Sequence, residues 1–224
     1  MATGTSADGP APVRIVIVDD HPVVREGLAM HLNAQPDLEV CGEADDVPSA
    51  LALFARSDPD LAVIDISLPD GNGLDLVRRI AENHPRVRIL VWSMYPAHLY
   101  AERALRAGAH GYLNKGEATS QLLTAVRTIL QGKIHLCGDL ADRLLRRVVG
   151  RRTEALSPID TLSDRELEAF GLIGGGLTTE EIATRMHISP KTVETFRSRI
   201  KEKLGLPNMT QLIQRATQWV LESR

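Results

Sequence analysis

Polar side chains that suit phosphoryl transfer stand at the ends of four short apolar runs. In chain order these side chains are Asp19 and Asp20, Asp65, Ser93, and Lys115. The apolar runs that lead into them cover residues 13–18, 61–64, 87–92 and 112–114. Such runs are typical of buried parallel strands, whose carboxyl ends meet in one crevice. We therefore expect these side chains to form a single site.

Each of these groups has a chemical role in phosphoryl transfer. Because neighbouring carboxylates repel one another, the three acids favour a divalent cation with oxygen ligands, for which Mg²⁺ fits best. Asp65 stands alone at its strand end and is the best-placed nucleophile. Asp20, Asp65 and the backbone carbonyl of Ser67 would then hold the cation. Lys115 would pair with the phosphoryl group, and the Ser93 hydroxyl would bind that group only while it is present.

The segments between the apolar runs have helical spacing. Apolar side chains recur at this spacing after Pro22 and after Gly73. Alternation of strand and helix over residues 13–131 predicts an α/β doubly wound, flavodoxin-like domain with five parallel strands. The strand ends of that sheet would hold the reactive side chains together.

Residues 157–224 have a different character, with four helix-start signals close together. Ser163 and Thr178 begin capping boxes, Ser189 precedes a proline at the first helical position, and Asn208 can cap a last helix. Glycines at 174–176 and at 205 supply the stops. We expect a small all-α domain of four helices, with a helix-turn-helix at about 178–204.

The third of these expected helices has one apolar face and one polar, net-positive face. Between Lys191 and Lys203 there are five cations and two acids. A helix-turn-helix places such a face in the major groove of DNA. The residues that we expect to contact phosphates or base edges are Lys191, Thr192, Glu194, Thr195, Ser198, Arg199 and Lys201.

The first part of the chain resembles the receiver domain of bacterial two-component response regulators of the NarL/FixJ group. The matching motifs are DDHPVVREGL at 19–28, DISLPDGNGL at 65–74 and GAHGYLNK at 108–115. The resemblance implies that Asp65 accepts a phosphoryl group from a histidine kinase, while Asp19 and Asp20 organise Mg²⁺. It also implies that Ser93 moves towards the phosphate and that Tyr112 turns inward behind it. Gly116 stands where many receivers have proline, so nothing obliges the preceding bond to be cis.

The last part of the chain is similar to LuxR-type DNA-binding domains. The motifs are LSDRE at 162–166, EIA at 181–183, SPKTVET at 189–195 and KLG at 203–205. The resemblance implies a recognition helix that begins at Pro190 and a last helix that supplies a dimer contact. Several relatives have lysine where Glu194 stands, so an acid here would accept from a cytosine amino group or exclude wrong sites.

The bulk properties agree with two domains and exclude several classes of protein. With 224 residues, 43% hydrophobic residues and a net charge of −3, the chain suits a soluble two-domain protein that does not coat nucleic acid indiscriminately. Cys41 and Cys137 are too few for a disulfide framework or zinc site, and no membrane segment or secretory signal is seen, so we expect a cytoplasmic protein. We assign residues 1–12 to a disordered leader and 132–156 to a partly helical linker.

These features predict a DNA-binding response regulator that is not an enzyme beyond assisting its own phosphorylation and dephosphorylation. Phosphorylation of Asp65 would alter the receiver surface, release a masked recognition helix, and control dimerisation. The expected partners are promoter DNA, a histidine kinase, a second copy of the chain and RNA polymerase, with no membrane. The alternative is a phosphorylation-independent transcription factor whose receiver is a dimer or partner platform.

Overall fold

A computed structural model describes residues 11–69, 71–117, 119–136 and 158–222 of the chain. The first part alternates strands and helices. In chain order its elements are β1 (Val13–Val18), α1 (Pro22–Asn33), β2 (Leu38–Ala44), α2 (Val47–Ser57), β3 (Leu61–Ile64), β4 (Ser67–Leu68), β5 (Gly71–Asn72), α3 (Gly73–Asn83), β6 (Arg88–Ser93), α4 (Ala97–Arg106), β7 (Gly111–Asn114) and α5 (Thr119–Leu130).

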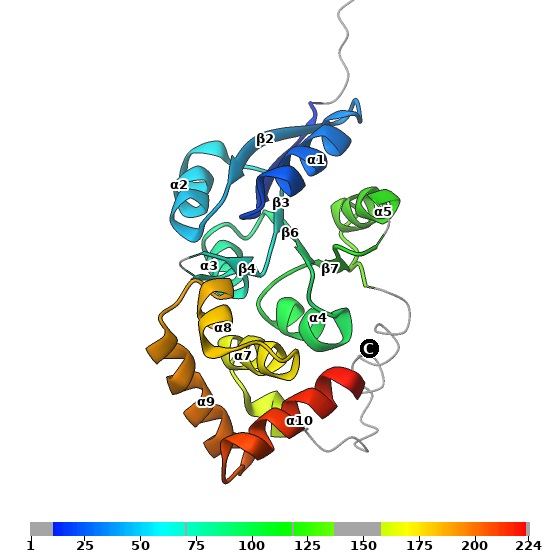
Figure 1. Cartoon of the computed structure of the whole chain (residues 1–224). Coiled ribbons are helices and arrows are strands. Elements are labelled where there is room, and N and C mark those ends of the chain that lie inside the picture. Colours follow the sequence, from blue (N-terminus) through cyan, green and yellow to red (C-terminus); the bar gives the residue numbers. More distant parts are fainter. Residues whose placement is uncertain (1–10, 70, 118, 137–157, 223–224) are drawn as a thin grey trace, which may run out of the picture.

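Five of these strands form one parallel sheet in the order β2-β1-β3-β6-β7. Helices α1 and α5 cover one face of the sheet, and α2, α3 and α4 cover the other (Figure 1). Both faces of β1 are therefore buried: Ile15 and Ile17 pack on one side and Val16 and Val18 on the other. The predicted doubly wound five-stranded fold is confirmed. The two-residue strands β4 and β5, which pair antiparallel just after the β3 strand end, were not expected.

The second part is all helical. After a 3₁₀ turn η1 (Pro158–Thr161) come the helices α7 (Asp164–Gly174), α8 (Thr179–Arg185), α9 (Pro190–Leu204) and α10 (Met209–Glu222). The predicted caps are present, because Ser163, Thr178 and Ser189 each accept the expected backbone N–H. Asn208 likewise accepts the backbone N–H of Gln211 at 3.0 Å. The predicted four-helix domain is confirmed.

The two parts pack against each other through α7. This helix lies beside α3 and α4 of the α/β part (Figure 1). Buried apolar residues of the two parts belong to one continuous cluster, to which α7 contributes Leu167 and Phe170. Most of the partly helical linker expected over residues 132–156 lies outside the described residues, as does nearly all of the expected leader. Among the described helices, none has the length and apolar character needed to cross a membrane.

Candidate functional sites

The reactive side chains predicted at the strand ends come together. Asp19 and Asp65 are 1% and 3% exposed at the ends of the neighbouring strands β1 and β3. Their backbones are held by strand hydrogen bonds, since the Asp65 N–H donates to the Val18 carbonyl at 2.8 Å. Carboxylate oxygens of Asp19, Asp20 and Asp65, with a ring nitrogen of His21, lie within 4.8 Å of one another. This is the acidic cluster that the sequence predicts.

Lys115 joins two members of the acidic cluster. Its Nζ lies 2.5 Å from Asp19 Oδ2 and 2.7 Å from Asp65 Oδ2, and its side chain is 7% exposed. Burial raises the pKa of Asp65 above its ordinary value, although the Lys115 ammonium opposes this shift. Burial alone would lower the pKa of Lys115, but the two carboxylates outweigh it and leave that pKa raised. The lysine is therefore a fixed cation beside the candidate nucleophile.

The acidic cluster has the chemistry of a divalent cation site. Within the described residues, Asp65 Oδ1 is a buried oxygen without a hydrogen-bond partner, while Asp20 Oδ1 lies 2.6 Å from Nδ1 of His21. Buried carboxylate oxygens in that condition are costly unless a cation or a proton satisfies them. Hard oxygen donors gathered at one point suit Mg²⁺, so the residues present fit the expected ion. Ser67, whose carbonyl we expect to bind the same ion, lies in β4 two residues beyond Asp65.

Gly73 holds the loop of the acidic cluster closed. A Cβ atom at this position would stand 1.9 Å from the Asp65 carbonyl oxygen. The Gly73 N–H donates to the Ile66 carbonyl at 2.8 Å, so helix α3 begins directly against the segment that carries the nucleophile. Only glycine allows that approach. Among the described residues no peptide bond is cis, which includes the bond before Gly116.

The two expected switch residues lie behind the acidic cluster. Ser93 ends β6 and is fully buried, and its Oγ accepts the backbone N–H of Tyr95 at 3.4 Å. Tyr112 in β7 is also fully buried, and its hydroxyl donates to the Tyr95 carbonyl at 2.7 Å. The Tyr112 ring is packed inside the receiver here, and its movement on phosphorylation stays a prediction.

The helix expected to read DNA, α9, presents its polar face to solvent. Lys191, Thr195, Ser198 and Arg199 are exposed, as is Glu194; Thr192 and Lys201 are partly buried. The apolar face of α9 packs inside the domain through Val193 and Ile200. The predicted division of the helix into a core face and an outer face is confirmed, and the contacts of the outer residues with DNA stay a prediction.

Some charges of α9 are already used within the domain. Arg197 contacts Glu194 at 2.8 Å and also Thr179 on α8, while Thr179 Oγ1 donates to Glu194 Oε1 at 3.1 Å. Lys203 pairs with the buried Glu166 at 2.6 Å. Glu194 therefore braces the helix-turn-helix, which the sequence alone did not indicate.

The prediction that the receiver covers the recognition helix is wrong for this structure. Most outer residues of α9 are exposed, and the polar contacts with the α/β part come from α7, from Leu162 just before it, and from the turn before α9. The reason is chemical, because α7 carries acids that match receiver arginines whereas the outer face of α9 is net positive. Helix α7, not α9, is the docked surface.

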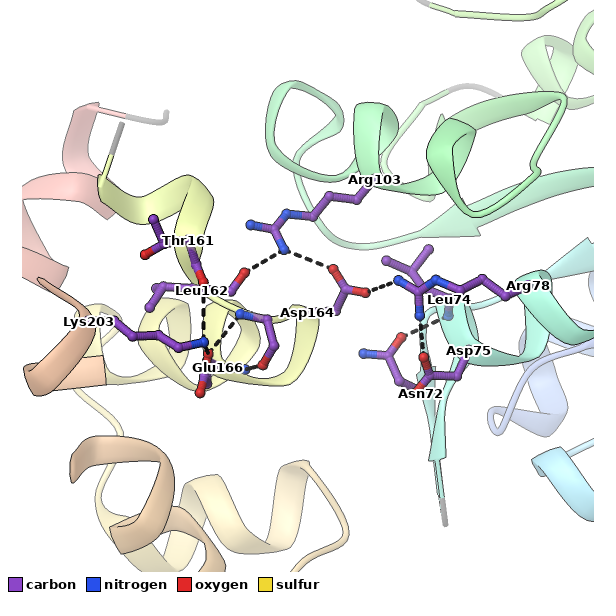
Figure 2. A network of polar contacts seen from close by, with 11 residues as sticks. Asn72, Leu74, Asp75, Arg78, Arg103, Thr161, Leu162, Asp164, Glu166 and Lys203 are labelled. Atoms are coloured by element: carbon purple, nitrogen blue, oxygen red, sulfur yellow. Dashed lines mark hydrogen bonds and ion pairs between the residues drawn. The ribbon is translucent and has the colours of Figure 1, made fainter. Parts of the chain in front are cut away.

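Asp164, at the start of α7, is the centre of the docking contact. Figure 2 shows its carboxylate between two receiver arginines, Arg78 on α3 at 2.6 Å and Arg103 on α4 at 2.9 Å. Arg103 also donates to the carbonyl of Leu162 at 2.8 Å. The Asp164 side chain is 13% exposed, so these pairs are less screened by solvent than ordinary surface pairs.

A second group of docking contacts lies nearer to the acidic cluster. Tyr95, which follows β6, donates its hydroxyl to Glu168 of α7 at 2.8 Å, and Arg165 contacts both Glu168 and the Gly71 carbonyl. His187, in the turn before α9, places Nε2 3.8 Å from Asp20 Oδ2. Sequence reasoning missed these residues because each partner is distant in the sequence and no local motif marks the pair.

Comparisons with known proteins agree with this architecture. Residues 15–127 match the family model described as the response regulator receiver domain, and residues 160–216 match bacterial regulatory proteins of the luxR family. The chain is 38% identical to the DNA-binding transcriptional activator DevR/DosR of Mycobacterium tuberculosis, over 92% of this chain and 94% of that protein. It is 37% identical to the oxygen regulatory protein NreC of Staphylococcus aureus, over 91% and 96%.

Solved structures of response regulators also resemble this chain over nearly its whole length. A structure of RcsB from Salmonella enterica serovar Typhimurium, bound to the promoter rprA in the presence of phosphomimetic beryllofluoride, has a TM-score of 0.61 at 25% identity. That likeness covers 92% of this chain and 98% of the other. Another RcsB structure reaches a TM-score of 0.65 at 25% identity, over 93% and 98%.

A receiver fold with an acidic cluster, joined to a helix-turn-helix domain, defines a class of two-domain transcription regulators. The two family models, and the relatives that match along nearly their whole length, identify one family within that class. The chain belongs to the NarL family of response regulators, which pair a receiver with a LuxR-type DNA-binding domain.

Proposed function

We propose that this response regulator accepts a phosphoryl group on Asp65 from a histidine kinase in the cytoplasm, and that phosphorylation controls its dimerisation on promoter DNA. The observation that carries the proposal is the buried acidic cluster with Lys115 fixed beside Asp65. We assign residues 13–131 to phosphoryl acceptance and residues 157–224 to DNA binding. RNA polymerase is the further partner expected of a transcription regulator.

Asp65 is the nucleophile in this proposal. Its carboxylate attacks the phosphorus of a phosphohistidine, the P–N bond breaks, and the imidazole leaves with the electron pair. Mg²⁺, held by Asp19, Asp20, Asp65 and the Ser67 carbonyl, would neutralise charge on the transferring group. Lys115, which needs only to shift from the carboxylates of Asp19 and Asp65, pairs with a phosphoryl oxygen.

Ser93 and Tyr112 carry the signal in this proposal. The Ser93 hydroxyl is buried at the end of the strand next to β3 and can donate to a phosphoryl oxygen, which changes its present contact with the Tyr95 N–H. Tyr112 is tied to the Tyr95 carbonyl and would follow that movement. The bound phosphoryl group thereby favours one receiver conformation over another.

DNA recognition is assigned to the exposed face of α9. Lys191 and Lys201 would bind phosphates, while Thr192, Thr195, Ser198 and Arg199 would face base edges, and Glu194 would border the groove. Helix α10 supports dimerisation, because Ile213 and Leu221 are 44% and 63% exposed on it. Two copies would present two recognition helices to a two-fold site.

The test is selection of genomic DNA fragments by the full chain with Mg²⁺, with and without beryllofluoride, beside the Asp65→Asn variant. Beryllofluoride stands in for the phosphoryl group on the acceptor carboxylate. We expect fragments sharing one inverted repeat to be enriched only by the wild-type chain with beryllofluoride. Equal enrichment in all samples would remove phosphorylation control and leave DNA binding intact.

The second candidate is a transcription factor that binds DNA without phosphorylation. One observation favours it: the outer face of α9 is already exposed while the DNA-binding domain is docked. In that case the receiver would be a platform for a dimer or partner, and Asp65→Asn would bind DNA as the wild-type chain does.

A further inference from the structure

Tyr95 contacts both expected switch residues and the DNA-binding domain. Its backbone N–H donates to Ser93 Oγ at 3.4 Å, and its carbonyl accepts the Tyr112 hydroxyl at 2.7 Å. Its hydroxyl donates to Glu168 Oε1 at 2.8 Å. Tyr95 therefore joins Ser93, Tyr112 and α7 through hydrogen bonds of one residue.

The ring of Tyr95 is held in place from the receiver side. It stacks on the buried Tyr100 of α4 with ring centroids 4.5 Å apart. Asn114, the residue directly before Lys115, also donates its side-chain N–H to the Tyr95 carbonyl at 2.8 Å. A shift at Ser93 or at the Lys115 loop is therefore transmitted to Tyr95, because its backbone is fixed to both.

Glu168 is the partner of Tyr95 on α7, and its carboxylate is buried, which is unfavourable for a charged group. The residue is 2% exposed, and Arg165 is its ion-pair partner at 3.1 Å. Burial raises the pKa of Glu168, and the charge of Asp65 raises it further, although Arg165 and the Tyr95 hydroxyl oppose the shift. Arg165 and the Tyr95 hydroxyl therefore hold this carboxylate at the docked surface, and further negative charge at Asp65 would oppose it.

We propose that Tyr95 is the interdomain coupling residue: its hydroxyl holds Glu168 and keeps α7 docked on the receiver, and phosphorylation of Asp65 breaks that contact. This inference rests on the proposed function. The added negative charge repels the buried Glu168 carboxylate, and the movement of Ser93 towards the phosphoryl group withdraws its contact with the Tyr95 backbone. Release of α7 then frees the DNA-binding domain from its own receiver for pairing with that of a second copy.

The test uses the full chain and measures hydrogen–deuterium exchange of α7 and α4, the helices that face each other in the docked state. In the wild-type chain we expect exchange in these helices to rise on addition of Mg²⁺ and beryllofluoride. Tyr95→Phe keeps the stacked ring and loses the donor, so it should shift the docking equilibrium towards release by roughly tenfold without beryllofluoride.

Glu168→Gln is the matched variant, because its amide oxygen still accepts the Tyr95 hydroxyl but has no charge for the phosphoryl group to repel. We expect it to stay docked and to respond to beryllofluoride by less than roughly a third of the wild-type change. Exchange in α1 and α5, on the opposite face of the sheet, reports on the fold of each variant.

The outcomes separate this inference from the proposed function. Suppose that exchange in α7 and α4 of the wild-type chain rises with beryllofluoride, but that Tyr95→Phe without beryllofluoride exchanges no faster than the wild-type chain. That result would overturn the coupling role of Tyr95 and leave the proposed function intact. A Glu168→Gln chain with the full wild-type response would overturn the repulsion. A wild-type chain that does not respond at all, while Asp65 binds beryllofluoride, would overturn the release of α7, and phosphorylation control itself would fall only if DNA selection were also unchanged.

Discussion

Helices α7 and α9 belong to the same small domain but use their polar residues in different ways. Three acids of α7 are largely or fully buried and paired: Asp164 and Glu168 face the receiver, and Glu166 faces Lys203. The polar residues on the outer face of α9 are exposed. The difference shows that docking and DNA recognition occupy separate surfaces of one domain, so control of DNA binding has to act through the position of the domain and not through cover of α9.

The largest expected effect is on DNA affinity and comes from the exposed face of α9. Arg199→Ala should weaken binding to the selected DNA by about 1–3 kcal/mol, or roughly 10–100-fold, because a cation that reads a base or phosphate is lost. Fluorescence anisotropy at fixed salt measures it. Arg79→Ala, which removes the same charge from the exposed face of α3, is the control and should leave affinity unchanged. Equal losses in both would mean that net charge alone matters.

The docked side should respond to Asp164→Asn. The change leaves Arg78 and Arg103 without the anion that lies between them, so we expect docking to weaken by about 1–2 kcal/mol. Exchange in α4 should rise roughly tenfold without beryllofluoride. Asp75→Asn is the control, since Asp75 also contacts Arg78 but belongs to the receiver and is 63% exposed. A wild-type exchange rate in Asp164→Asn would exclude this pair from docking.

A smaller effect is expected from pH. The docked Glu168 has a pKa raised above its ordinary value of 4.5, chiefly by burial, whereas the released residue regains the ordinary value. The docked state therefore binds more protons, and docking should strengthen as pH falls through the raised pKa towards 4.5. Exchange in α7 should slow by a few-fold between about pH 7.5 and about pH 5.5 after correction for intrinsic rates. Glu168→Gln should lose this part of the dependence.

The smallest effect concerns Lys203, which lies on α9 but faces α7. Lys203→Met should lower the free energy of unfolding by about 1 kcal/mol, because Glu166 loses its cation, and the partial exposure of Lys203 limits the cost. Its DNA affinity should change little. Lys201→Met should do the reverse, weakening DNA binding with little change in stability. Denaturant titration of both variants measures stability, and fluorescence anisotropy measures DNA affinity. A loss of stability in Lys201→Met, or a loss of DNA affinity in Lys203→Met, would contradict this assignment of the two lysines.

Features set by local sequence were predictable. The caps at Ser163, Thr178 and Ser189 were found because each cap bonds to a residue three positions away. The strand ends that gather Asp65 and Lys115 were found because buried parallel strands are short apolar runs. These rules locate side chains within one domain.

The docking contacts were not predictable in the same way. Arg78 and Asp164 are 86 positions apart, and Tyr95 and Glu168 are 73 apart. No periodic pattern marks either pair, and a surface arginine is ordinarily a solvated charge. Contacts across domains depend on how two finished surfaces fit.

The contact of Asp164 with two receiver arginines has a consequence for how such proteins diversify. The receiver and the DNA-binding domain each match a family model of their own, so recombination could exchange them between paralogues. A hybrid whose receiver lacks Arg78 or Arg103, or whose second domain lacks Asp164, would keep both folds and lose the docked arrangement. An exchange of halves that preserved docking would therefore have to preserve this trio of charges, which makes the trio a condition of compatibility between this receiver and this DNA-binding domain.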